Sequence, residues 1–183
     1  MTASQPPAQG HAHDRQDLNF ISLGVGIVTV SDSRTLESDK SGKLLEDTLQ
    51  AAGHKCVHRI VIPDEVEHIQ AQVNDFLADD RVHTILVTGG TGVAPRDVTP
   101  EALQPLFEKT LPGFGELFRT LSFQEIGAAC IQSRAIAGIA DGKVIWALPG
   151  STGACRLAIE SIILPQLDSR TRPCSFPGLL LAD

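Results

Sequence analysis

Short apolar runs alternate with longer amphipathic stretches along the first half of the chain. The run Val25–Val30 is apolar on both faces of an extended chain, which is typical of a parallel strand covered by helices. Runs over 55–62 and 84–87 predict two further strands, the first of them stopped by Pro63. The order strand, helix, strand, helix, strand predicts an α/β fold with a mostly parallel sheet.

Two amphipathic helices are predicted between these strands. Ser41 is the expected N-cap of the first helix and Gly53 its C-terminal stop. The second helix is expected to open at Pro63 or Asp64. The residues on the apolar faces are Leu44, Leu45, Thr48, Leu49 and Ala52 in the first helix, and Val66, Ile69, Val73, Phe76 and Leu77 in the second.

The pattern changes after the third strand. Thr99 and Pro100 suit the N-cap and first position of a short helix that Pro105 limits. A helical stretch is expected around 116–121. Asp141-Gly142 lies between two apolar runs and predicts a two-residue hairpin turn. A final helix is expected to stop at Pro165.

Composition limits the class of protein. The chain has 183 residues, of which 42% are hydrophobic, enough for one domain with a substantial core. A net charge of −7 without a Lys/Arg cluster disfavours nucleic-acid binding, because phosphate neutralisation needs clustered cations. No apolar run approaches the roughly 20 residues that span a bilayer. We therefore expect a cytoplasmic protein with neither nucleic acid nor membrane as partner.

The chain is divided into three parts on composition. Residues 1–19 lack the apolar core of a secretory signal and are expected to be a disordered tail, in which His11 and His13 at most bind metal weakly. Residues 20–168 are expected to form the domain, and 169–183 an extended tail. The cysteines show neither CxxC nor zinc spacing, so Cys56, Cys130 and Cys155 are interpreted as buried free thiols in a reducing cytosol.

Polar or glycine-rich segments follow several predicted strands. They are SDSR at 31–34, PDE at 63–65, TGGTGVAPRD at 88–97 and PGS at 149–151. In an open parallel sheet, ligands bind beyond the carboxyl ends of the strands. These segments are therefore expected to meet at one edge and form a site.

The segment 88–97, called the glycine loop below, leaves two interpretations open. Gly89, Gly90 and Gly92 allow positive φ or a close approach to a ligand, and free N–H groups there could cradle an anion. A tight strand-to-helix turn without a ligand explains the glycines equally well. The loop matches neither GxxxxGK[ST] nor GxGxxG, so it is not a P-loop or a dinucleotide fingerprint.

Two aspartates add a second possibility for chemistry. Asp97 could cap the backbone or pair with Arg96, or it could hold Mg²⁺ or a substrate hydroxyl beside phosphates. Asp64 offers a second carboxylate from the neighbouring strand end. Capping at a helix start is the more usual role of such an Asp-Glu pair.

Several motifs together carry a family resemblance. VSDSR, SGKLLEDTL, IPDE, TGGTGVAPRDVTPEA, LPGFGELFR, SRAIAG and ALPGS resemble the MoaB/MogA family of molybdenum-cofactor biosynthesis proteins, from about Gly24 to about Leu167. GFGELFR and LPGS favour the MoaB branch. The resemblance implies a three-layer α/β/α sandwich whose C-terminal hairpin adds an antiparallel strand, assembled as a homotrimer or hexamer. It also implies Mg²⁺-dependent transfer of AMP from ATP to molybdopterin, with the product handed to a MoeA-like molybdate-insertion protein.

The resemblance also assigns roles to residues. Asp64 and Asp97 match the family's two important aspartates, with Mg²⁺ coordination and orientation of the attacking phosphate as their roles. Gly89, Gly90, Thr91 and Gly92 would hold a phosphate. Other residues expected to line the pocket are Ser31, Asp32, Ser33, Gly150 and Ser151, and Arg34, Arg96, Arg119 and Arg134 are available cations. A non-catalytic molybdopterin carrier or scaffold is the alternative. Some organisms hold both paralogues, and the MogA-like protein is then expected to carry the activity.

Overall fold

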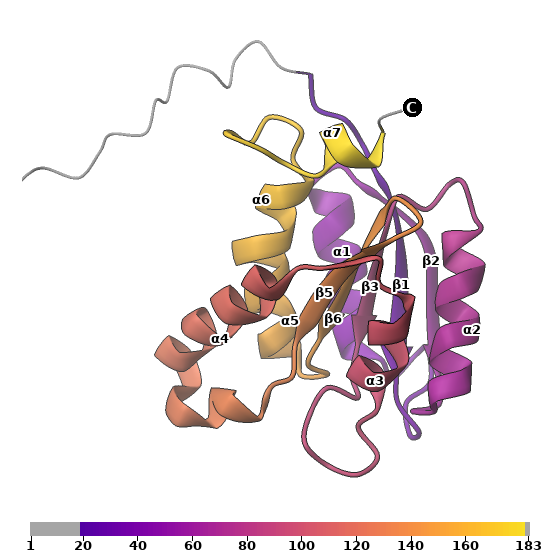
Figure 1. Ribbon diagram of the computed structural model, residues 1–183, viewed down its shortest axis with the longest axis vertical. Coiled ribbons are helices and arrows are strands. Elements are labelled where there is room, and N and C mark those ends of the chain that lie inside the picture. Colours follow the sequence, from indigo (N-terminus) through magenta and orange to yellow (C-terminus); the bar gives the residue numbers. More distant parts are fainter. Residues whose placement is uncertain (1–18, 182–183) are drawn as a thin grey trace, which may run out of the picture.

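A computed structural model describes residues 19–181 (Figure 1). Its sheet has the strand order β2-β1-β3-β6-β5-β4. The strands are β1 (Gly24–Val30), β2 (Lys55–Ile62), β3 (Thr84–Thr88), β4 (Lys109–Thr110), β5 (Ile136–Ala140) and β6 (Lys143–Leu148). β2, β1, β3 and β6 are parallel, whereas β5 is antiparallel to both β6 and β4. The mostly parallel sheet with an antiparallel hairpin is confirmed, and β4 is an addition that no sequence pattern indicated.

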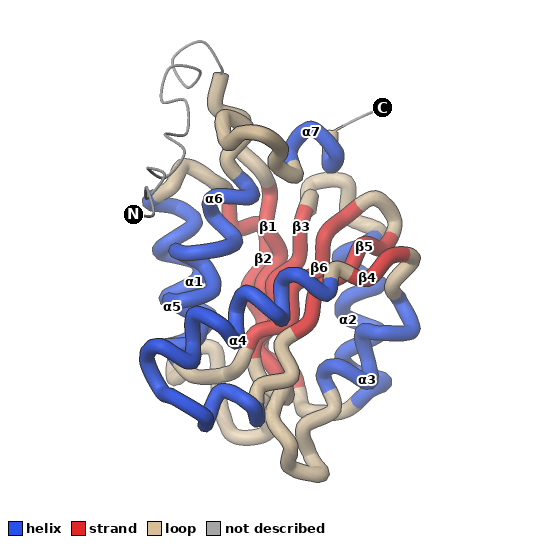
Figure 2. Tube along the Cα trace, turned by 60° about the vertical axis from the view of Figure 1, so that its left-hand side comes forward, coloured by secondary structure: helices blue, strands red, loops and turns tan. Residues whose placement is uncertain are grey.

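Helices cover both faces of the sheet (Figure 2). Alternate strand residues decide which face each side chain serves: Ile27, Leu86 and Trp146 join one core, and Val28, Val87 and Ile145 the other. The first core lies under α1 (Lys40–Ala51), α4 (Pro112–Ile126), α5 (Thr152–Ala158) and α6 (Leu164–Leu167). The second lies under α2 (Val66–Leu77) and α3 (Thr99–Leu103). The expected three layers are therefore present.

The hairpin turn and the end of α1 follow the sequence signals. Asp141 and Gly142 both have positive φ, as a two-residue turn between β5 and β6 requires. Gly53 has φ +91° immediately after the C-cap Ala52, so it stops α1 as expected.

Helix starts were predicted less well. The N-cap of α1 is Asp39 and not Ser41, because the Asp39 carboxylate accepts the Gly42 amide at 2.9 Å. α2 begins at Val66, with Glu65 as its N-cap. Val98 and not Thr99 caps α3, and the Thr99 hydroxyl instead donates to the Gly89 carbonyl oxygen at 2.8 Å. Ser41 and Thr99, the two expected caps, instead donate to the distant carbonyl oxygens of Gly150 and Gly89.

Two expectations for the C-terminal region are wrong. The last helix does not stop at Pro165, because a π turn over Ile159–Ile163 carries it into α6. Pro165 lies in the first turn of α6, where the missing N–H of proline is tolerated. The segment after Leu167 is not simply extended, because it contains α7 (Pro177–Leu180) and Phe176 stacks edge-on against Trp146 at 5.4 Å. Burial of that aromatic pair holds the segment against the first core.

Other expectations have a mixed outcome. The tail expected over 1–19, including His11 and His13, lies outside the described residues apart from Asn19 and remains a prediction. Within 19–181, no helix is long and apolar enough to cross a membrane. The four cysteines are free, with Cys130 and Cys155 buried, Cys56 half-buried and Cys174 exposed.

Candidate functional site

The segments that follow β1, β2, β3 and β6 meet at one edge of the sheet. They line a hollow of about 550 Å³ that contains residues 31–34, Asp64, 89–92, Asp97 and 149–151. All of the predicted site residues contribute to it. The parallel register of these strands is the cause, because it brings their carboxyl ends to the same side.

The glycine loop turns sharply as it leaves β3. Gly89 and Gly90 have φ +104° and +61°, conformations that a side chain makes costly. A Cβ on Gly89 would lie 2.2 Å from the Val30 carbonyl oxygen, and one on Gly90 would lie 2.7 Å from the Asp64 carboxylate. The glycines are thus required first by the protein's own packing, and the same packing holds the loop backbone against Asp64.

Asp64 is buried, with 8% of its surface exposed, and lines the hollow. Its carboxylate accepts one long bond, from the Val98 amide at 3.4 Å. Burial is the main cause that raises the pKa of Asp64 above its usual range, and the charges of Asp97 and Asp32 add to the rise. A carboxylate that is expensive to ionise in the free protein is suited to a cationic partner in the bound state.

Asp97, the last residue of the glycine loop, is half-buried and also lines the hollow. Its Oδ2 accepts the Ala94 amide at 2.9 Å, and its own amide donates to the Ala94 carbonyl oxygen at 2.9 Å. A Cβ on Gly92 would lie 2.7 Å from this carboxylate. Asp97 therefore caps the backbone of the turn and also lies at the hollow. Within residues 19–181, no donor contacts its Oδ1.

Arg96 does not pair with its neighbour Asp97. It binds Asp32 through two bonds, from Nε at 3.0 Å and from Nη2 at 2.9 Å, and approaches Glu65 at 3.7 Å. The guanidinium is the main cause that holds the pKa of Asp32 below its usual value. This exposed pair joins the 31–34 segment to the glycine loop across the hollow.

The remaining predicted residues hold the segments together. Arg34 donates to the Gly150 carbonyl oxygen at 3.1 Å, and Ser31 Oγ accepts the Arg34 amide at 3.3 Å. Ser151 caps α5 by accepting the Ala154 amide at 3.3 Å. Ser33 lines the hollow beside Ser31. These side chains define its shape, and Arg34 brings a positive charge close to Gly150.

One wall was missed by reasoning from the sequence. It is formed by α4 and the turns after it, with Phe118, Ser122, Ile126, Ala129, Cys130, Gln132 and Ser133. The buried hydroxyl of Ser122 follows Phe114 and Phe118 at helical spacing. A polar residue at the end of an apolar stripe was the signal that could have indicated this wall.

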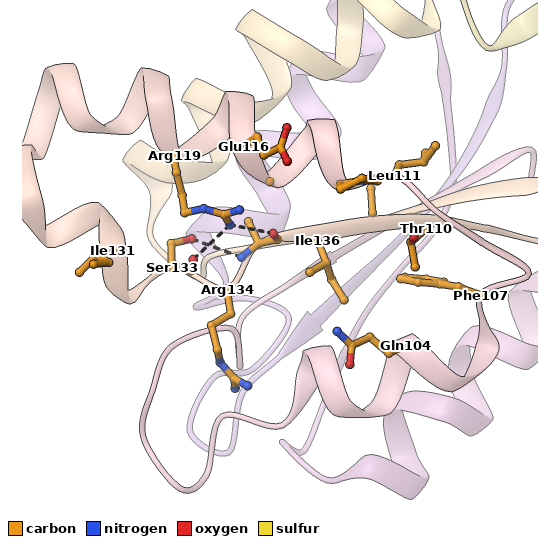
Figure 3. A pocket seen from close by; sticks show the side chains of 14 residues that line it. Gln104, Phe107, Thr110, Leu111, Glu116, Arg119, Ile131, Ser133, Arg134 and Ile136 are labelled. Atoms are coloured by element: carbon orange, nitrogen blue, oxygen red, sulfur yellow. Dashed lines mark hydrogen bonds between the residues drawn. The ribbon is translucent and has the colours of Figure 1, made fainter.

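A second hollow of about 530 Å³ lies beside the first, between α4 and the outer strands (Figure 3). It is lined by apolar residues such as Phe107, Leu111 and Ile136 and contains neither aspartate. Arg119 reaches its wall, where its Nη1 donates to the carbonyl oxygens of Ser133 at 3.4 Å and Ala135 at 3.3 Å. The two hollows are similar in size, so the polar chemistry marks the first as the candidate site.

The donor set limits which groups could be bound. Across residues 19–181 there is no cluster of three or more His, Cys, Asp or Glu side chains that could hold a metal by itself. Mg²⁺ is usually held by one or two carboxylates together with substrate phosphates and water. Asp64 and Asp97, which line the same hollow, fit that mode. Burial raises the pKa of Cys155 to about 11, so this thiol beside the site is a poor nucleophile.

Known proteins share this chain's sequence and fold. A family model described as "Probable molybdopterin binding domain" matches residues 26–169. Molybdenum cofactor biosynthesis protein B of Escherichia coli (strain K12) is 52% identical over 157 residues, covering 86% of this chain and 92% of that protein. A crystal structure of Molybdenum cofactor biosynthesis protein B matches with a TM-score of 0.79 and 46% identity, covering 80% of this chain and 92% of that one.

A more distant structure agrees. The tungsten cofactor synthesizing protein MoaB from Pyrococcus furiosus matches with a TM-score of 0.68 and 36% identity, covering 77% of this chain and 90% of that chain. The fold and the site segments thus define a molybdopterin-binding-type α/β domain. The chain belongs to this family, and the relatives named above are its MoaB proteins, as the motifs indicated.

Proposed function

We propose that this protein acts in molybdenum cofactor biosynthesis as a Mg²⁺-dependent molybdopterin adenylyltransferase. It binds molybdopterin and ATP in the first hollow and transfers AMP to the terminal phosphate of molybdopterin. The observation that carries the proposal is the presence of two carboxylates in one hollow at the sheet edge, with Asp64 next to Gly90 and Asp97 next to Gly92 of the glycine loop. Family membership supports the pterin substrate, and the physical chemistry of the loop supports the phosphates.

The proposed reaction exchanges one phosphoanhydride bond for another. A terminal phosphate oxygen of molybdopterin forms a bond to the α-phosphorus of ATP, while the bond from that phosphorus to the β-phosphate oxygen breaks and pyrophosphate leaves. No protein nucleophile is needed, so catalysis depends on positioning and charge neutralisation. Mg²⁺, held by Asp64 and Asp97, would neutralise part of the phosphate charge.

The residues have separate tasks in this proposal. Asp64 and Asp97 would hold the metal and orient the attacking oxygen. The amides of Gly89, Gly90, Thr91 and Gly92, with Gly150 and Ser151 opposite, would contact phosphates. Ser31, Asp32 and Ser33 would line the nucleotide or pterin pocket at the mouth.

Partners and location belong to the same proposal. Leu117, Phe123 and Ile126 on α4 and Ile131 after it are large apolar side chains exposed to solvent, and Ile126 also lines the hollow. Burial of such side chains favours self-association, and we propose a homotrimer or hexamer that covers some of them. The adenylylated product would pass to a MoeA-like molybdate-insertion protein in the cytoplasm, where free thiols persist.

Transfer of label tests the proposal. Purified protein is incubated with molybdopterin, Mg²⁺ and ATP labelled at the α-phosphate. Label that appears in a molybdopterin product only when all three are present supports adenylyl transfer. Tight molybdopterin binding without transfer would overturn the enzyme assignment and leave the carrier or scaffold role. Absence of both binding and transfer would overturn the proposal as a whole.

A further inference from the structure

We propose that Arg134 is a positioning residue that clamps the glycine loop and thereby fixes Asp97 for adenylyl transfer. Arg134 lies just before β5, outside the four segments at the sheet edge. The proposal rests on the proposed function for its catalytic consequence, whereas its structural consequence can be measured without turnover.

Arg134 contacts the loop at both of its ends. Its amide donates to the Thr91 carbonyl oxygen at 2.9 Å, and its Nε donates to the Gly92 carbonyl oxygen at 2.6 Å. Its Nη2 donates to the Asp97 carbonyl oxygen at 2.6 Å. One residue therefore joins the two backbone positions that bracket the exposed residues 93–96.

Glu101 orients the clamp from the other side. Its carboxylate pairs with Nη1 of Arg134, and this is the main cause that holds the pKa of Glu101 below its usual value. Nε, Nη1 and Nη2 thus each have a partner, two on the loop and one on α3. The planar fork of the guanidinium fixes these directions relative to one another, which a lysine ammonium cannot do.

The loop has little else to hold it between Gly92 and Asp97. Residues 93–96 are exposed, and the Ala94–Asp97 bonds are internal to the turn. Among the described residues, the other side-chain contacts that tie 93–96 to the rest of the protein come from Arg96, whose pairs with Asp32 and Glu65 are exposed to solvent. Exposed pairs restrain a chain weakly. Of the restraints on residues 92–97, the Arg134 bonds are therefore the ones that join both ends of the exposed turn to a single side chain.

Arg119 provides a matched control within the same region. It also donates to backbone carbonyl oxygens, those of Ser133 and Ala135, but makes no bond to the glycine loop. In Figure 3 the side chain of Arg134 extends away from that of Arg119. A change at Arg119 therefore leaves the bonds from Arg134 to the glycine loop in place.

The test compares Arg134→Lys, Arg119→Lys and the wild type in two measurements. In amide hydrogen exchange of the free protein, Arg134→Lys is expected to speed exchange of the Asp97 and Thr99 amides by about tenfold or more, with strand amides unchanged. In steady-state assays its kcat for pyrophosphate release is expected to fall by about tenfold to a hundredfold, with a much smaller change in KM for ATP. Arg119→Lys should match the wild type in both.

The outcomes separate this inference from the proposed function. Unchanged exchange in Arg134→Lys, or an equal change in Arg119→Lys, would overturn the clamp. Faster exchange with an unaltered kcat would show that the clamp orders the loop but does not position Asp97 for transfer, which also overturns the proposal. A wild-type protein without turnover would refute the adenylyltransferase and, with it, the catalytic part of the inference, while exchange would still decide the clamp.

Discussion

Two buried carboxylates lie near the same edge of the sheet in opposite surroundings. Asp39 is 1% exposed and accepts bonds from Thr29 Oγ1 at 2.8 Å, the Gly42 amide at 2.9 Å and Arg59 Nη1 at 3.3 Å. Asp64 is 8% exposed, accepts one 3.4 Å bond, and faces the charges of Asp97 and Asp32. The first is compensated inside the fold, and the second is left for a ligand to compensate.

This difference separates structure from function more reliably than burial does. A buried charge that is paired and hydrogen-bonded contributes to the fold, and removing it leaves its partners without compensation. A buried charge without such partners weakens the fold, so its presence points to a role outside folding. Asp39 was not singled out from the sequence, whereas Asp64 was singled out by its motif.

The largest expected effect is on stability at Asp39. Asp39→Ala removes the N-cap of α1, the acceptor of the Thr29 hydroxyl and one of the two carboxylates that pair with Arg59, so we expect a loss of about 3–5 kcal/mol in the free energy of unfolding. Urea denaturation measures the loss. Asp47→Ala, which removes an exposed partner of Lys43, is the control and should change little. A loss below about 1 kcal/mol for Asp39→Ala would remove the contrast with Asp64.

Asp64→Asn should have the opposite sign. The raised pKa of Asp64 means that the folded state binds this proton more tightly than the unfolded state. The wild-type Asp64 carboxyl therefore stabilises the fold at acidic pH, and this stabilisation is lost as the pH rises through the pKa of Asp64 in the folded state. At pH 7 the neutral amide should therefore stabilise the protein.

The pH dependence provides the check on that prediction. The gain from Asp64→Asn should shrink as pH is lowered toward 4, because the wild-type carboxyl then takes up its own proton. Urea denaturation of both proteins at several pH values measures this. A destabilised Asp64→Asn at neutral pH would place Asp64 with Asp39 among the structural carboxylates.

The smallest effect is expected at the exposed pair of Asp32 and Arg96. Arg96→Gln should leave the free energy of unfolding nearly unchanged, since both side chains are about half exposed. The pKa of Asp32 should rise toward its usual value, because Arg96 is the main cause of its lowering. Carboxyl NMR titration measures the pKa. An unchanged pKa would show that the pair does not form in solution.

The sequence predicted the parts of the fold that depend on local chemistry. The Asp141-Gly142 turn, the Gly53 stop and the three N-terminal strands follow from residue preferences and apolar runs. It did not predict β4, whose two residues Lys109 and Thr110 are too few to form a pattern. It also placed the end of the last helix at Pro165, because a π turn depends on packing that no local signal encodes.

The candidate site was predicted where it consists of strand ends and missed where it depends on distant contacts. The topology brought the four segments together as expected. Arg134 was noted only as an available cation. Its partners on the glycine loop are backbone carbonyl oxygens far away in sequence, such as that of Gly92 at a separation of 42 residues. The α4 wall was missed because a single serine, Ser122, marks it.

The rate of pyrophosphate release by Asp97→Asn, measured beside the wild type with molybdopterin, ATP and Mg²⁺, tests the central claim most directly. Unfolding and the oligomeric state are compared in the same preparations. We expect the rate to fall by about a hundredfold or more while unfolding and assembly match the wild type, because the carboxylate serves the site. Wild-type turnover in a folded Asp97→Asn protein would contradict the account, and so would a loss of activity that follows loss of the fold or assembly.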